Sequence, residues 1–354
     1  MKVIFFCLYA SMYLPYNKGT TTNLLPRNAF VPAIIAFGDS IMDPGNNNYL
    51  NTFTKANFPP YGKDFLGGEP TGRFNNGKIL GDFIAKALGV KEYLPAYLDS
   101  YIQDKDFITG VSFASAGTGY DPLTASLASV ISLSLQAEMF KQYIEKLKRI
   151  VGEGAANNII TNSVYIVSAS SNDFLTNYFA NPIRRSQYDV PEYANKLVEF
   201  AVSFIQEIHA LGARRIVVFS AVPLGCVPIE RTLLGGKHRK CVEKFNRAAK
   251  LFNSMLRPQL QLLSSTLPQA RVTYCDCYNP LTSIIENPHI YGLEVTNLGC
   301  CGTGLLEMGY ACNEFSALCH NDSAYFFWDS LHPSEKGCEI FTNLILPDIM
   351  KSIF

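Results

Sequence analysis

Five short runs rich in β-branched and aromatic residues recur along the chain, separated by longer segments with helical periodicity. The runs span 33–37, 110–115, 163–168, 214–220 and 271–274. Short runs that are apolar throughout are typical of parallel strands buried on both faces. Strands that alternate with helices specify a parallel sheet covered by helices on both sides. The sequence therefore predicts a three-layer α/β/α fold, doubly wound around about five parallel strands.

The segments between the runs place apolar residues on one face of a helix. In 192–211, apolar residues recur at three- and four-residue steps from Leu197 to Leu211, and Gly212 ends the pattern. Similar patterns cover 78–88, 139–151, 243–263 and 334–351. Neither an internal repeat nor a low-complexity linker interrupts the alternation. We therefore expect a single domain over 32–354.

The charge balance limits the partners that the chain can attract. Its 354 residues include 30 basic and 30 acidic side chains, and no run of five or more like charges occurs. A chain with zero net charge has no field that would attract a polyphosphate, so we expect no nucleic-acid partner. Hydrophobic residues make up 48% of the chain and charged residues 17%, which predicts a large core rather than disorder.

The N-terminus has the pattern of a secretion signal. Lys2 precedes an apolar run over 3–14, which fits a signal-peptide core of about 7–15 residues and is too short for a ~20-residue membrane span. We assign 1–19 to a signal peptide with an undetermined cleavage site. The alternative is a buried N-terminal helix or strand, because no small-x-small cleavage site follows Leu14. A secreted, extracellular protein without a transmembrane segment in its mature chain is expected.

The cysteines suggest disulfides, and one asparagine suggests glycosylation. Nine cysteines follow Cys7 in the predicted signal, at 226, 241, 275, 277, 300, 301, 312, 319 and 338. An odd number leaves at least one thiol unpaired within the chain. A zinc cluster is the alternative, but the Cys-x₂₋₄-Cys pairs of structural zinc sites are absent, so we favour a bridge between Cys226 and Cys241 and bridges within 300–319. Asn321 begins the only Asn-x-Ser/Thr acceptor of the chain.

A serine follows the first predicted strand. Ligands of such sheets bind beyond the carboxyl ends of the strands, and Ser40 lies three residues after the run that ends at Phe37. Gly38 permits a tight turn that would present Ser40 to solvent as a nucleophile. The alternative is a Gly/Asp/Ser turn that caps the next helix. The Gly-x-Ser-x-Gly elbow of α/β-hydrolases is absent, because Met42 occupies the second glycine position.

A base with its orienting carboxylate lies near the other end of the chain. Of five histidines, only His332 has an acidic residue, Asp329, three positions before it and a predicted helix directly after it. One turn of chain lets Asp329 accept a hydrogen bond from one imidazole nitrogen while the other takes the serine proton. The alternative is that Asp329 caps the helix and His332 is merely its neighbour. Because the base must be neutral, activity should rise from acid towards neutral pH.

Two further strand ends offer hydrogen-bond donors for a tetrahedral oxyanion. Gly117 follows the second run and offers a backbone N–H that no Cβ shields, and Asn172 follows the third and offers its side-chain amide. Glycine, serine and asparagine also populate most ordinary turns, so each loop on its own is equally consistent with a simple connection. Together with Ser40 and His332, however, the two loops complete the requirements of an acyl-transfer site.

These segments together resemble the GDSL esterase/lipases of the SGNH hydrolase superfamily, in their plant secreted branch. The motifs that carry the resemblance are Phe37-Gly-Asp-Ser-Ile-Met-Asp43 with Gly45-Asn-Asn-Asn48, Thr71-Gly-Arg-Phe74, Phe113-Ala-Ser-Ala-Gly117, Ser171-Asn-Asp173, Gly212-Ala-Arg214 with Val222-Pro-Leu-Gly-Cys226, Cys300-Cys-Gly-Thr-Gly304 and Phe327-Trp-Asp-Ser-Leu-His-Pro333. The stretches Asn57-Phe-Pro-Pro-Tyr-Gly-Lys-Asp64, Val167-Ser-Ala-Ser-Ser-Asn-Asp173 and Ser220-Ala-Val-Pro223 are most similar to anther and pollen-coat extracellular lipases.

The resemblance implies a role for each candidate residue. Ser40 becomes the nucleophile and also a backbone oxyanion donor, with Gly117 and Asn172 as the second and third donors. His332 becomes the general base and Asp329 its orienting carboxylate. The implied fold is a flavodoxin-like sheet of five parallel strands, and the implied location is the cell wall or pollen coat.

Three positions depart from the family pattern. Serine stands at 112 where asparagine is usual and at 170 where glycine is usual, and Pro44 replaces the usual threonine or Val-Gly neighbours. A side chain at Ser170 would narrow the pocket or shift Asn172, and Ser112 lacks an amide that would brace the second oxyanion loop. We expect these changes to affect rate and substrate preference rather than mechanism.

The implied activity is hydrolysis of a carboxylic ester, of a lipid or an acylated glycan, without a metal or an organic cofactor. One alternative is acyl transfer to an alcohol by the same acyl-enzyme, and another is a catalytically silent lipid- or glycan-binding coat protein. The aromatic loop 49–65, with Phe53, Phe58 and Tyr61, is either an acyl channel or a cover for the core. The sequence specifies neither the acyl chain nor the oligomeric state.

Overall fold

A four-stranded parallel sheet lies at the centre of the computed structural model, which describes residues 30–354. Its strands are β1 (Ile34–Gly38), β2 (Val164–Ser168), β3 (Arg215–Phe219) and β4 (Arg271–Cys275), side by side in that order. The register pairs Ile34 with Val164 across β1 and β2. The predicted three-layer α/β fold is confirmed. The predicted signal peptide lies outside the described residues.

The predicted strand 110–115 forms only a single parallel bridge to β1, between Ser112 and Ala36. The backbone N–H groups of Phe113 and Ser115 donate to β1 at 2.8 and 2.9 Å. The ladder does not continue, because the N–H of Gly38 donates to the Gln136 side chain at 2.8 Å instead of to a strand carbonyl. Since 110–115 and β2 flank β1 on opposite sides, the strand order reverses at β1, where a parallel sheet binds its ligands.

A second, two-stranded sheet was not predicted. It consists of β5 (Val295–Gly299) and β6 (Tyr325–Phe327), which are parallel to each other. β6 is three residues long and β5 is only partly buried, so neither carries enough of an apolar pattern to be recognised as a strand.

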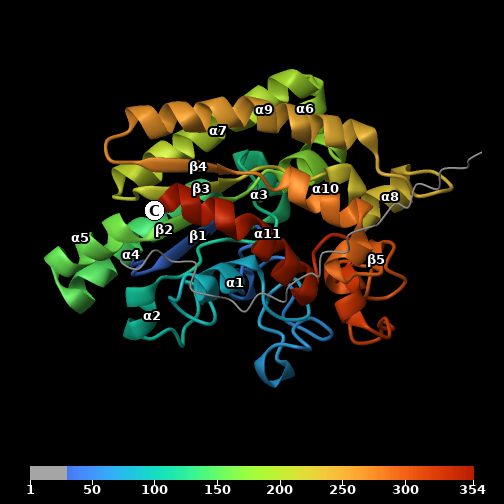
Figure 1. Cartoon of the computed structure of the whole chain (residues 1–354), viewed down its shortest axis with the longest axis horizontal. Helices are drawn as coiled ribbons and strands as arrows, with labels where there is room; N and C mark the ends of the chain where they lie inside the picture. Colours follow the sequence, from blue (N-terminus) through green and yellow to red (C-terminus); the bar gives the residue numbers. More distant parts are fainter. Residues whose placement is uncertain (1–29) are drawn as a thin grey trace, which may run out of the picture.

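The helices lie on both faces of the central sheet. They are α1 (Leu80–Ala87), α2 (Asp104–Thr109), α3 (Pro122–Ala128), α4 (Leu133–Val151), α5 (Glu153–Asn162), α6 (Pro182–Gln187), α7 (Val190–Ala210), α8 (Pro228–Leu234), α9 (Glu243–Thr266), α10 (Tyr278–Glu286) and α11 (Glu335–Ile353), with a π-helix at Asp173–Phe179. The five predicted helices correspond to α1, α4, α7, α9 and α11. Figure 1 shows α7 and α9 side by side on one face of the sheet and α11 on the other.

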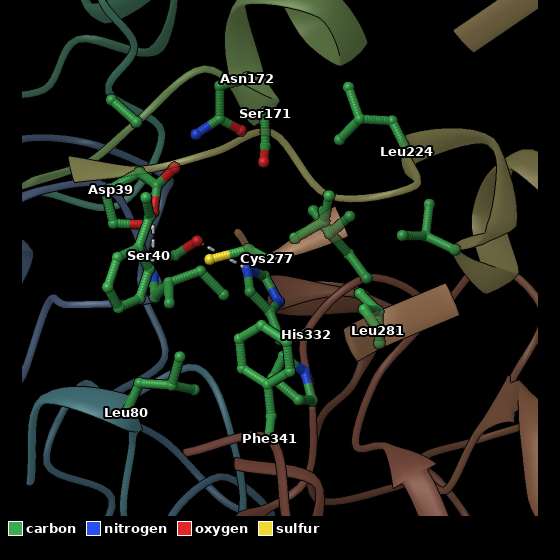
Figure 2. A pocket seen from close by; sticks show the side chains of 18 of the residues that line it. Asp39, Ser40, Leu80, Ser171, Asn172, Leu224, Cys277, Leu281, His332 and Phe341 are labelled. Atoms are coloured by element: carbon green, nitrogen blue, oxygen red, sulfur yellow. Dashed lines mark hydrogen bonds between the residues drawn. The ribbon is translucent and has the colours of Figure 1, made fainter. Parts of the chain in front are cut away.

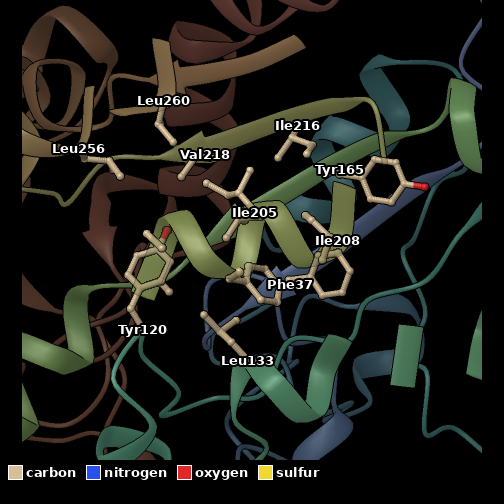
Figure 3. Packing of buried hydrophobic residues seen from close by; sticks show 14 of the residues in the cluster. Phe37, Tyr120, Leu133, Tyr165, Ile205, Ile208, Ile216, Val218, Leu256 and Leu260 are labelled. Atoms are coloured by element: carbon tan, nitrogen blue, oxygen red, sulfur yellow. The ribbon is translucent and has the colours of Figure 1, made fainter. Parts of the chain in front are cut away.

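Successive strand residues face opposite layers, as the pleat of a strand requires. Phe37 and Val218 pack with α4, α5, α7 and α9, and Figure 3 shows Ile205 and Ile208 of α7 among these strand side chains. Ala36 and Val217 face the other way and pack with α1, α10 and α11. The sheet is therefore buried on both faces, and only its ends are available for a site.

Three disulfides join cysteines among the described residues. Cys226 pairs with Cys241, as predicted, and the 300–319 segment holds the other two bridges, Cys300–Cys319 and Cys301–Cys312. Cys275, Cys277 and Cys338 are buried free thiols. Within 30–354, no cluster of three or more His, Cys, Asp or Glu side chains is arranged to hold a metal ion.

Over the same residues, no single helix is both long and apolar enough to cross a membrane. Within these residues, only α3 and α4 taken together are long and apolar enough, and these two helices meet at an angle of 92°.

Candidate active site

The turn after β1 requires a glycine and places Ser40 at the end of the sheet. Gly38 has a φ of 128°, and a Cβ there would come within 1.8 Å of the Ser168 carbonyl oxygen on β2. The backbone can therefore turn sharply only because position 38 has no side chain. Ser40 follows with 8% of its surface exposed, at the point where the strand order reverses.

Asp329 and His332 lie on the loop between β6 and α11. One carboxylate oxygen of Asp329 accepts the backbone N–H groups of Leu331 at 2.8 Å and His332 at 2.7 Å. The other oxygen lies 2.8 Å from Nδ1 of His332. Ser334 caps the N-terminus of α11 directly after this loop, by accepting from the N–H of Gly337. Asp329 thus folds its own loop and holds the imidazole ring in the same turn.

The two ends of the chain meet at the site. Nε2 of His332 lies 2.9 Å from Oγ of Ser40, although the residues are 292 positions apart. Figure 2 shows the two side chains joined by a hydrogen bond. Asp329, His332 and Ser40 therefore form one continuous line of hydrogen bonds, in which a neutral imidazole can accept the serine proton while its other nitrogen donates to the carboxylate.

Tyr61 is a site residue that the sequence reasoning missed. Its hydroxyl donates to Asp329 at 2.9 Å and accepts the backbone N–H of Gly309 at 2.8 Å. Burial and the neighbouring carboxylate raise the pKa of Tyr61 well above its ordinary value, so the phenol stays protonated and keeps donating. The Tyr61 ring packs in a buried cluster with Phe74 and Trp328, in agreement with the predicted core cover, whereas the contact of its hydroxyl with Asp329 was not predicted. The family-like stretch 57–64 was the only signal for that contact.

The candidate oxyanion donors lie around Ser40. Among the described residues, the backbone N–H groups of Ser40 and Gly117 donate to no protein acceptor. Gly117 has a φ of 90°, which favours glycine. The Asn172 amide donates to the Thr118 carbonyl at 2.9 Å, and this contact leaves its second N–H available. Together with His332, these three residues line the same cleft.

A network of buried side chains fixes the Gly117 loop. The carboxylate of Asp43 accepts the N–H of Ala116 at 2.9 Å, and the Asn47 amide donates to the Ala116 carbonyl at 2.9 Å. Asn46 donates to the carbonyls of Ser112 and Ala114 at 2.9 and 2.8 Å. The asparagines of the 45–48 motif therefore brace this loop. Ser112, which departs from the family pattern, contributes as well, because its hydroxyl donates to the Met42 carbonyl at 2.6 Å.

Asp173 joins the Asn172 loop to the Gly117 loop. It accepts the backbone N–H groups of Tyr120 at 2.7 Å and Asp121 at 3.1 Å, and burial raises its pKa to about 7. Its carboxylate also fills the space beside Gly119, where a Cβ would come within 2.1 Å of it. The Gly117 and Asn172 loops are thus locked together by one buried carboxyl group.

Asp39, next to Ser40, is another buried acid of the site. Burial raises its pKa to about 7, and its Coulombic interaction with His332 opposes that rise. Asp39 is therefore largely protonated at acid pH and becomes an anion near neutrality, where it would stabilise a positive charge on the imidazole.

Ser170 has a backbone conformation that favours glycine, the residue usual in the family at this position. Its φ is 102°, its side chain is buried, and its hydroxyl has no hydrogen-bond partner among the described residues. The Asn172 amide nevertheless reaches the Thr118 carbonyl. Serine at position 170 therefore strains the backbone, but the side-chain amide of Asn172 keeps its hydrogen bond to Thr118.

The substitution Ser170→Gly is expected to stabilise the fold by about 1–2 kcal/mol. It removes backbone strain of about 1–3 kcal/mol and a buried hydroxyl without a partner, which together outweigh about 1 kcal/mol of extra unfolded-state entropy. Thermal denaturation should show a Tm higher by about 1.5–3 °C. Ser171→Gly is the control and should lower Tm, because Ser171 has no positive φ. A lower Tm for Ser170→Gly would contradict the inference that Ser170 strains the backbone.

Two hollows meet at the nucleophile position. An outer cleft of about 620 Å³ has Gly117 in its wall, and an inner cavity of about 80 Å³ lies on the other side of Ser40. The residues common to both are Ser40, Asn172, Leu331 and His332. An ester placed at Ser40 can therefore extend in two directions.

Comparisons with known proteins show what this chain is similar to. A family model described as GDSL-like lipase/acylhydrolase matches residues 34–345. One GDSL esterase/lipase of Arabidopsis thaliana is 50% identical, covering 93% of this chain and 89% of its own length. The Arabidopsis GDSL esterase/lipase EXL3 is 45% identical, with 96% and 93% covered. A solved structure, a catalytic mutant of the Geobacillus stearothermophilus acetylxylan esterase Axe2, covers 90% of this chain and 94% of its own, with 11% identity and a TM-score of 0.41.

The matched region contains the turn with Ser40, the loops with Gly117 and Asn172, and the loop with Asp329 and His332. The relatives extend over nearly the whole chain at close to half identity. The chain therefore belongs to the GDSL-like lipase/acylhydrolase family of the SGNH hydrolase superfamily and is a carboxylic ester hydrolase.

Proposed function

We propose that the protein is a secreted serine esterase in which Ser40, His332 and Asp329 form the catalytic triad. The observation that carries this proposal is the line of hydrogen bonds from Asp329 through His332 to Ser40, with distances of 2.8 and 2.9 Å. Ser40, Gly117 and Asn172 form the oxyanion hole. In this proposal their three N–H groups donate to the carbonyl oxygen of a bound ester, which is supported by their lining one cleft with His332.

In the acylation step, the ester carbonyl carbon exchanges its bond to the alkoxy oxygen for a bond to Ser40 Oγ, and His332 carries the proton between the two oxygens. His332 Nε2 takes the proton of Ser40 as Oγ bonds to the ester carbonyl carbon. The three donors stabilise the resulting oxyanion, and the carboxylate of Asp329 stabilises the imidazolium. The bond to the alkoxy oxygen then breaks, and His332 gives its proton to the departing alcohol.

Deacylation repeats these steps with water. His332 removes a proton from water, the hydroxide bonds to the acyl carbon, and the bond to Ser40 Oγ breaks as the serine regains its proton. The free acid then leaves. Neither a metal nor an organic cofactor takes part in these steps.

Secretion is proposed from the cysteines. Three disulfides lie among the described residues, and such bridges persist in oxidising compartments. Asn321 is exposed, as a glycosylation acceptor must be. The proposed substrate is an ester of a lipid or an acylated glycan, and the proposed location is the cell wall or pollen coat.

A fluorophosphonate probe tests the proposed nucleophile in the wild-type protein. Attack by Ser40 Oγ on the phosphorus expels fluoride, so intact mass spectrometry should show one adduct per chain, on the peptide that contains Ser40. Ser265→Ala is the matched control, because Ser265 is exposed near the end of α9 and lines neither hollow, and its labelling should equal that of the wild type. A chain that stays unlabelled would favour the catalytically silent coat protein, and an adduct on another residue would refute Ser40.

A further inference from the structure

We propose that the inner cavity is the acyl site and that it selects short acyl chains, from acetyl to butyryl, while the alcohol part of the ester lies in the outer cleft. This inference depends on the proposed function, because it divides the same catalytic centre into two subsites. The two hollows differ in their walls, in their access to solvent and in their size, and each difference favours the same orientation.

The walls of the inner cavity suit an alkyl chain. Its lining is predominantly apolar and includes Leu224, Leu281, Phe326 and Phe341, all of which belong to the buried core. Figure 2 shows Leu224 and Leu281 across the space from Asp39 and Ser40. An apolar chain placed there would exchange water for hydrocarbon contacts, whereas a sugar would leave hydroxyls against the apolar part of the wall without partners.

The outer cleft is open to solvent. Phe53 and Tyr310 at its edge are 89% and 51% exposed, and Asn181, Thr54 and Thr176 add polar groups to its lining. Exposed aromatic rings and polar side chains at the same edge can contact either an apolar or a hydroxylated alcohol.

The order of product release distinguishes the two sites. The alcohol leaves first and water must then enter, so the alcohol side needs an open path. The acyl group stays bonded to Ser40 through both steps, so it can occupy the more enclosed hollow until hydrolysis frees it. The inner cavity is walled mostly by buried residues, whereas the outer cleft is open to solvent. We therefore assign the acyl group to the inner cavity and the alcohol to the outer cleft.

The size of the inner cavity limits the chain length. Its volume is about 80 Å³, roughly half that of an engineered apolar cavity of about 150 Å³ that binds benzene. In proportion, it holds about three carbon atoms beyond the carbonyl carbon at Ser40. Because close-packed walls yield little, longer chains would have to displace core side chains.

The test is a series of p-nitrophenyl esters from acetate to laurate, in which only the acyl chain changes. Wild type should show its highest kcat/KM between acetate and butyrate, with a fall of at least about tenfold by octanoate, because each misplaced methylene changes discrimination by about 10–200-fold. Leu281→Ala enlarges the cavity and should raise the octanoate-to-acetate ratio by about tenfold. Ile284→Ala is the matched control, since Ile284 is a buried residue of α10 that does not line the cavity.

The outcomes separate the acyl-site inference from the proposed function. Failure of every ester to react, together with an unlabelled Ser40, would remove the proposed function itself. A wild type that labels fully but prefers octanoate or laurate would overturn only the acyl assignment. Equal shifts in the chain-length profile for Leu281→Ala and Ile284→Ala would also overturn the acyl assignment. Full fluorophosphonate labelling of both variants would show that each retains a folded site.

Discussion

Alanine in place of Ser40 is expected to lower kcat for ester hydrolysis by about 10⁶-fold, the order of loss found when the nucleophile of a serine hydrolase triad is removed. No other hydroxyl within the described residues is hydrogen-bonded to Nε2 of His332. The change removes one oxygen atom and leaves the backbone N–H of residue 40 in place. Rates on p-nitrophenyl acetate, corrected for the reaction in buffer, measure the loss.

The fold of the Ser40→Ala variant should be unchanged, because the Ser40 side chain bonds only to His332 among the described residues. Near-identical circular dichroism and Tm values would show this. Ser265→Ala, at an exposed position that lines neither hollow, provides the matched variant and should retain wild-type rates. If Ser40→Ala kept even one hundredth of the wild-type kcat, another nucleophile would have to be sought.

The substitution Asp329→Asn is expected to lower kcat by about 10⁴-fold. The Asp329 oxygen that accepts two backbone N–H groups would remain an amide oxygen. The amide nitrogen would then face Nδ1 of His332 and donate to it. Nδ1 would become an acceptor, the ring proton would move to Nε2, and His332 could no longer take the proton of Ser40. Single-turnover kinetics on p-nitrophenyl acetate would measure this step directly.

Tyr61→Phe is the informative comparison for Asp329→Asn. It removes one hydrogen bond to the carboxylate but preserves the charge and the imidazole tautomer, so we expect a loss of about tenfold, consistent with one hydrogen bond to a charged group. Thermal denaturation should accompany both variants, because each alters a buried network. Equal losses for the two variants would mean that the tautomer is not what Asp329 controls.

The parts of the fold that could be predicted are those whose signal is local. Each of the strands β1 to β4 is a short run rich in β-branched, aromatic or other apolar residues, and α7 repeats its apolar pattern along most of its length, so a short window suffices. The 110–115 segment was predicted as a strand but forms only one bridge to β1. The side chain of Gln136, which is distant in the sequence, accepts the backbone N–H of Gly38 that would have continued the ladder. β5 and β6 were missed because their pairing, rather than their composition, makes them strands.

The site shows the same division between local and distant signals. Asp329 and His332 are three residues apart, and Ser40 follows a strand directly, so the sequence proposes all three, and the structure brings them together. Tyr61 contacts Asp329 across 268 positions, and no local pattern distinguishes its hydroxyl from that of any other loop tyrosine. The inner cavity is likewise invisible in the sequence, because its walls come from the strand ends, α1, α10 and α11.

The disulfides near the site have a consequence for how substrates enter. The Cys301–Cys312 bridge closes a segment that contains Gly309 and Tyr310, both of which line the outer cleft, and Gly309 is also held by Tyr61. A segment tied covalently at both ends and pinned in its middle cannot swing aside as a hinged flap does. We expect the mouth of the enzyme to be a fixed aperture, so that entry depends on diffusion and on the shape of the arriving molecule.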